Sequence, residues 1–90
     1  MTCEVEVKIC NQLGLHLRAA AALAKLAESF ESEVLVRKDG TTANGKSVIA
    51  LVTLNAPLGT SLEIVAEGPD AEQAVSDLKE LVETRFGEAQ

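Results

Sequence analysis

The sequence has almost no aromatic side chains and few positive charges. Phe30 and Phe86 are its only aromatic residues, and lysine and arginine together number 8 against 14 aspartates and glutamates. Proteins that bind nucleic acid neutralise its phosphates with lysine and arginine, and many stack bases on aromatic rings. A chain with two rings and a formal net charge of −6 is therefore not expected to bind nucleic acid.

Residues that ligate metals are equally scarce. Cys3 and Cys10 are the only cysteines and His16 is the only histidine, so no cluster has the spacing of a metal site. The two cysteines lie at opposite ends of one predicted strand and point to opposite faces, so a mutual disulfide is not expected. We predict no metal and no cofactor.

Long apolar runs are missing as well. No run approaches the roughly 20 residues of a transmembrane helix, and the N-terminal MTCEVEVKIC lacks the pattern of a signal peptide. The expected location is cytoplasmic, without membrane insertion. Hydrophobic residues nevertheless make up 47% of the chain, and no linker or repeat divides it, so we expect one domain covering residues 1–90.

The hydrophobic pattern predicts four strands and three helices. Strands are expected at residues 3–9, 33–38, 41–43 and 61–67, where apolar residues alternate with polar ones or flank the hairpin-forming pair Asp39-Gly40. Helices are expected at residues 18–30, 47–54 and 70–87, the last beginning with a capping box between Asp70 and Gln73 and ending at Gly87. The order βαββαβα predicts an α+β open-faced β-sandwich, a four-stranded antiparallel sheet covered on one face by three helices.

The lone histidine lies where the first strand pattern gives way to the first helix pattern. Asn11 and Gly14 supply turn chemistry, and His16 follows at or just before the first helical turn. Free backbone N–H groups there favour a phosphoryl group, the guanidinium of Arg18 suits phosphate oxygens, and an imidazole nitrogen can attack phosphorus. A lone histidine at a helix start is more often a surface or capping residue. The hypothesis of a phosphate-handling nucleophile therefore rests on the strand, the glycine turn, the histidine, the arginine and the helix start in consecutive order.

Ser47 precedes the second predicted helix. It follows Asn44-Gly45 and Lys46, so its hydroxyl is expected to cap that helix. A cap and nothing more is one interpretation. A phosphate added to Ser47 would place about −1.5 to −2 charge beside apolar residues that could contact a partner, so a regulatory site is the other.

Taken together, these motifs resemble those of the HPr family of phosphocarriers in the bacterial phosphoenolpyruvate-dependent phosphotransferase system. The resemblance covers essentially the whole chain. It rests on two patterns at the right separation, carried by Asn11, Gly14, His16, Leu17 and Arg18 and by Lys46, Ser47, Val48 and Ile49.

The resemblance implies the function of a phosphoryl carrier. His16 would accept a phosphoryl group on Nδ1 from phospho-Enzyme I and pass it to a histidine of an EIIA-type domain, with Arg18 stabilising the phosphate. Ser47 would be a regulatory site for an HPr kinase/phosphorylase. The chain would be a stoichiometric carrier rather than an enzyme, expected as a monomer, and Leu17, Arg18, Ala21, Ile49 and Val52 would form its partner surface.

One residue departs from the family pattern. The family usually has proline after the arginine, where this chain has Ala19, a strong helix former placed at a position where the fixed φ of proline suits a helix start. A mainly regulatory protein with weak transfer, of a nitrogen-type branch or controlled at Ser47, is therefore an alternative. An unrelated interaction domain is a third interpretation.

Overall fold

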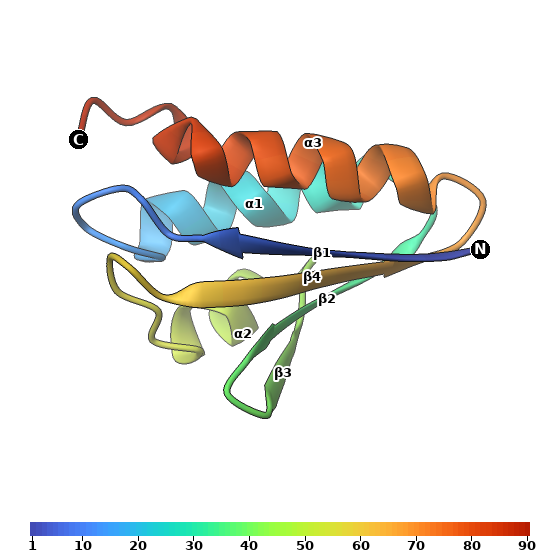
Figure 1. Ribbon diagram of the computed structural model, residues 1–90, viewed down its shortest axis with the longest axis horizontal. Coiled ribbons are helices and arrows are strands. Elements are labelled where there is room, and N and C mark those ends of the chain that lie inside the picture. The colour runs from blue at the N-terminus through green and yellow to red at the C-terminus, as the bar shows by residue number, and fades with distance from the viewer.

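The structure, a computed structural model, describes residues 1–90 and is built on one antiparallel sheet. Its strands are β1 (Thr2–Lys8), β2 (Glu33–Lys38), β3 (Thr41–Asn44) and β4 (Ser61–Glu67), arranged in the order β1-β4-β2-β3 (Figure 1). The central pairing of β4 with both β1 and β2 is antiparallel, as is the β2–β3 hairpin. Asp39 and Gly40 have φ values of 48° and 82° in the hairpin turn, as the predicted two-residue turn requires.

Three α-helices lie on one face of this sheet. They are α1 (Leu17–Glu28), α2 (Val48–Thr53) and α3 (Ala71–Glu83), and a short 3₁₀ turn, η1 (Arg85–Gly87), follows α3. The predicted order βαββαβα and the predicted open-faced β-sandwich are confirmed. None of the helices is both long enough and apolar enough to span a membrane.

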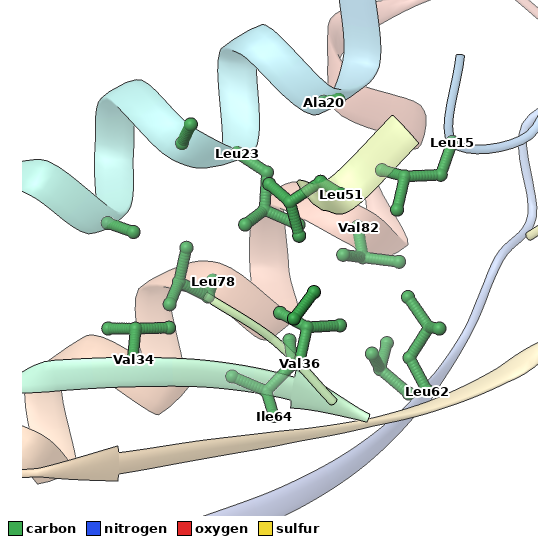
Figure 2. Packing of buried hydrophobic residues seen from close by; sticks show 14 of the residues in the cluster. Leu15, Ala20, Leu23, Val34, Val36, Leu51, Leu62, Ile64, Leu78 and Val82 are labelled. Atoms are coloured by element: carbon green, nitrogen blue, oxygen red, sulfur yellow. The ribbon is translucent and has the colours of Figure 1, made fainter. Parts of the chain in front are cut away.

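The core fills the space between the sheet and the helices. Alternate strand residues such as Val34, Val36 and Ile64 point toward Leu23 of α1 and Leu78 of α3 (Figure 2), and all five are at most 1% exposed. This is the outcome of the period of two in the strands and of the apolar stripes on the helices. Burying each such side chain contributes about 1.5–3 kcal/mol to the free energy of folding.

The predicted capping box at the start of α3 is wrong. Asp70 is the N-cap residue, but its side chain forms no capping bond, and the Gln73 amide donates to Asp77 instead. The Asp70 carboxylate reaches across to the segment before β2, where it accepts hydrogen bonds from the backbone N–H groups of Glu31 and Ser32, both at 2.9 Å, and from the Ser32 hydroxyl. The Asp70 carboxylate thus forms tertiary hydrogen bonds in place of the predicted local capping bond.

The predicted ends of the first and last helices also need correction. The first ends at Glu28 rather than at residue 30, and α3 ends at Glu83 rather than at Gly87. Arg85 and Phe86 have φ values of 60° and 55°, which stop α3 and turn the chain back. The Phe86 ring, 9% exposed, packs into the core.

Candidate functional site

The loop between β1 and α1 is built around Asn11 and Gly14. Asn11 is fully buried, and its amide Nδ2 donates to the Gly14 carbonyl at 2.8 Å. Gly14 has a φ of +71°, and a Cβ at this position would lie 2.6 Å from the Ala56 carbonyl oxygen. Only glycine fits this turn, so the two residues predicted to shape the loop do so.

His16 is the N-cap residue of α1. Its extended backbone (φ −79°, ψ −178°) lets Nδ1 accept the backbone N–H of Arg18 at 3.3 Å, while its carbonyl accepts the N–H of Ala20. The N–H groups of Leu17 and Ala19 have no hydrogen-bond partner in the chain. His16 thus stands at a helix end that has unpaired donors and the positive end of the helix dipole, an environment that favours an anionic phosphoryl group.

The other ring nitrogen of His16 faces a residue that the sequence motifs did not indicate. Nε2 lies 2.5 Å from Oε2 of Glu88, and Oε1 of the same carboxylate accepts the Asn11 amide at 2.9 Å. The Asn11 hydrogen bond is the largest effect that holds the pKa of Glu88 below its ordinary 4.5, against the opposing effect of burial. The hydrogen bond with His16 and the charge of Arg18 lower this pKa further.

The C-terminal residues 88–90 lie across the loop that carries His16. The backbone N–H of Gln12 donates to the Gln90 carbonyl at 2.9 Å, and Figure 1 shows the C-terminus beside the loop that leads from β1 to α1. An open depression of about 690 Å³ lies next to His16. It is lined by residues of the β1–α1 loop, by the first turns of α1 and by residues 88–90. No local motif predicts this contact, because His16 and Glu88 are 72 positions apart.

Arg18 is exposed beside the histidine. Its guanidinium takes part in neither of the two ion pairs of the structure, so it is available to an incoming anion. Residue 19 was expected at a first helical position, but α1 begins at Leu17, so Ala19 is the third helical residue. It is fully buried, and the helix forms without proline there.

Ser47 caps α2, as predicted, and is not part of the His16 site. Its Oγ accepts the N–H of Ala50 at 3.2 Å. The preceding Lys46 donates to the carbonyl of Phe30, just beyond the C-terminal end of α1, whereas His16 stands at the N-terminal end. A helix of 12 residues is about 18 Å long at 1.5 Å per residue, so Ser47 lies away from the histidine.

The residues predicted to contact partners are all exposed. Leu17 is 67%, Ile49 80% and Val52 37% exposed, and Ala21 also faces solvent. Ala21 borders both the depression at His16 and a second one that reaches Lys46. The exposed side of α1 thus connects the histidine to the neighbourhood of α2.

Comparison with known proteins gives a consistent picture. The family profile described as PTS HPr component phosphorylation site matches residues 3–84. The phosphocarrier protein NPr of Escherichia coli K12 is 42% identical over 89 residues, covering 98% of this chain and 99% of that protein. The phosphocarrier protein HPr of Cupriavidus necator is 36% identical over 85 residues, covering 94% and 96%.

A solved structure is similar over the same length. HPr-C-His from Thermoanaerobacter tengcongensis superposes with a TM-score of 0.93 at 38% identity, covering 98% of this chain and 99% of that one. The profile match, the phosphocarrier relatives and this superposition agree on the family and on the fold. The chain therefore belongs to the HPr family of phosphocarrier proteins of the phosphotransferase system.

Proposed function

We propose that His16 carries the phosphoryl group, accepting it from phospho-Enzyme I and passing it to a histidine of an EIIA-type domain. The observation that carries this proposal is the position of Nδ1 at the N-terminus of α1, beside the unpaired N–H groups of Leu17 and Ala19 and the free guanidinium of Arg18. The whole chain acts as one domain, as a cytoplasmic monomer.

The transfer itself is an exchange of one N–P bond for another. The lone pair on Nδ1 forms a bond to phosphorus as the bond to the donor histidine breaks, and the donor nitrogen keeps that electron pair. The phosphoryl oxygens then accept from the free N–H groups, and Arg18 balances their charge. Transfer to the acceptor runs through the same geometry in reverse.

The exposed apolar residues provide the docking surface in this proposal. Leu17 and Ala21 on α1 flank the histidine, and Ile49 and Val52 extend the surface over α2. A carrier has to release each partner quickly, and a small surface of this kind suits brief complexes.

Regulation at Ser47 by an HPr kinase/phosphorylase is the second element of the proposal. Ser47 is half-buried and its neighbour Ile49 is strongly exposed, so a phosphate there adds negative charge to the docking surface rather than to the His16 site. Such a modification weakens docking without unfolding the domain.

A second candidate function follows from the relatives, which include NPr as well as HPr. In that case the chain serves mainly as a regulator in a nitrogen-type branch, with weak transfer. Rates of transfer from the purified chain to acceptors of the two branches separate these functions.

The direct test of the carrier proposal is the intact mass after incubation with phosphoenolpyruvate, Mg²⁺ and Enzyme I. We expect a gain of one phosphoryl group that mild acid removes, because a phosphoramidate is acid-labile and a phosphoserine ester is not. The gain should persist in Ser47→Ala and vanish in His16→Ala. An acid-stable gain, or a gain retained in His16→Ala, would contradict the proposal.

A further inference from the structure

We propose that Glu88 is a positioning residue that holds the proton of His16 on Nε2 and thereby presents the lone pair of Nδ1 for phosphoryl transfer. This inference rests on the proposed role of His16 as the carrier. It assigns a task to a carboxylate that lies outside both sequence motifs and comes from the far end of the chain.

Two independent contacts require the same form of the ring. An ionised carboxylate can only accept, so its approach to 2.5 Å from Nε2 requires that Nε2 carry the proton. At the other nitrogen the backbone N–H of Arg18 can only donate, so Nδ1 must hold a lone pair. Only the neutral ring protonated at Nε2 satisfies both contacts, and in that form Nδ1 is the nucleophile.

The carboxylate also matches the charge that the reaction creates. When Nδ1 bonds to phosphorus and Nε2 keeps its proton, the imidazole ring becomes positively charged. Glu88 faces that ring directly, and its lowered pKa keeps it ionised. Arg18 is the other charged side chain that lines this depression, and its guanidinium serves the phosphoryl oxygens, so Glu88 is the protein group that faces the ring charge from the Nε2 side. Ser-His-Asp hydrolases use a buried carboxylate in the same two ways.

The protein holds Glu88 in place by contacts that do not involve His16. Arg85 and Phe86 adopt left-handed backbone conformations that are unfavourable for residues other than glycine, and such conformations persist only where the surroundings enforce them. The buried Phe86 ring anchors this turn, the Asn11 amide binds Oε1 of Glu88, and Gln12 pairs with Gln90. The carboxylate is thus positioned before any phosphoryl group arrives.

The same contacts make Glu88→Gln an unusually informative variant. The Asn11 Nδ2 group donates both to the Gly14 carbonyl and to Glu88. A flip of the Asn11 amide would place its oxygen against the Gly14 carbonyl oxygen, so the amide keeps its orientation. A glutamine amide at position 88 therefore directs its oxygen to Asn11 and its NH₂ to His16. An NH₂ donor facing Nε2 favours a lone pair there and moves the proton to Nδ1, which blocks the nucleophile.

The first readout needs no partner protein. Long-range ¹H–¹⁵N spectra of the neutral ring report which nitrogen carries the proton. We expect Nε2–H in the wild type, a shift toward Nδ1–H in Glu88→Gln, and a mixture in Glu88→Ala. Glu83→Gln, which removes an exposed carboxylate on α3, should match the wild type. The same tautomer ratio in the wild type and in Glu88→Gln would overturn the inference.

The second readout is the initial rate of phosphorylation by Enzyme I. Losing a hydrogen bond to a charged group should slow kcat by about tenfold or more in Glu88→Gln, with KM for the carrier little changed, because Glu88 does not belong to the apolar docking residues. Glu83→Gln should keep the wild-type rate. If the wild type accepts no phosphoryl group, the carrier proposal fails. If the wild type accepts one and Glu88→Gln accepts it equally fast, the positioning role alone fails.

Discussion

Gly14→Ala should destabilise the protein through a contact that can be separated from the strain of the backbone. Gly14 has a φ of +71°, which costs a residue with a Cβ about 1–2 kcal/mol. The added carbon would also lie 2.6 Å from the Ala56 carbonyl oxygen and 2.8 Å from the Cα of Pro57, both backbone atoms that cannot rotate away. Overpacking of this kind costs about 1–3 kcal/mol more, so the free energy of unfolding should fall by about 2–5 kcal/mol in total.

The chain contains a matched control for the backbone part of this loss. Gly40 has a φ of +82°, but a Cβ there would meet nothing within 4 Å. Gly40→Ala should therefore show only the strain, about 1–2 kcal/mol. The assay is urea denaturation of both variants and the wild type, comparing midpoints at equal slope. If Gly14→Ala loses no more stability than Gly40→Ala, the close approach of the loop to Ala56 does not exist.

The same variant bears on function. Relieving the contact requires the loop to move away from Ala56, which also accepts the backbone N–H of Leu15 at 2.8 Å. His16 follows directly, so its ring should lose its position against Glu88. We expect phosphorylation by Enzyme I to slow in Gly14→Ala under conditions where the variant is still folded, and to remain normal in Gly40→Ala.

Three further predictions concern other parts of the fold. Lys38 donates through Nζ to the carbonyls of Leu54 and Asn55 at the end of α2, at 3.0 and 2.8 Å. Lys38→Met should therefore lower the free energy of unfolding by about 1–2 kcal/mol. Urea denaturation measures this loss, and an unchanged midpoint would refute it. The hydrogen bond from Ser32 is the largest cause that lowers the pKa of Asp70 from 3.8 in the folded protein. The ionised Asp70 therefore contributes fully to the free energy of unfolding above pH 3.8, and this contribution is lost as the pH falls through the lowered pKa of the folded state. Thermal melts between pH 6 and 2 should show a flatter acid limb in Asp70→Asn, and an identical limb would contradict the assignment. Ile49→Asp should keep the free energy of unfolding within about 0.5 kcal/mol while raising the KM of Enzyme I for the carrier, and an unchanged KM would remove Ile49 from the docking surface.

Much of this molecule could be predicted because its signals are local. The alternation in residues 61–67 places Leu62 and Ile64 on the core side of β4, and the pair Asp39-Gly40 forms the expected hairpin turn. The turn at Gly14 and the helix start after His16 are likewise encoded within a few residues of each other.

The features that could not be predicted depend on residues far apart in the sequence. Aspartate is a common helix N-cap residue, yet the Asp70 carboxylate accepts hydrogen bonds from the segment at Ser32. Only the packing of the fold brings Ser32 close to Asp70. Glu88 reaches His16 because Arg85 and Phe86 adopt positive φ values. Neither residue is glycine, so the sequence gives no signal that predicts this turn. A local pattern predicts the position of His16 but not that of the carboxylate that contacts its ring.

The placement of residues 88–90 has a practical consequence for anyone handling this protein. The carbonyl of Gln90 accepts a hydrogen bond from the loop that carries His16, so residues joined after Gln90 would leave the fold beside the His16 ring. Met1 lies at the opposite end of the molecule (Figure 1). An affinity tag or fluorescent fusion attached after Gln90 would lie next to His16, and a polyhistidine tag would add foreign imidazoles there. The same tag before Met1 would leave the surroundings of His16 open.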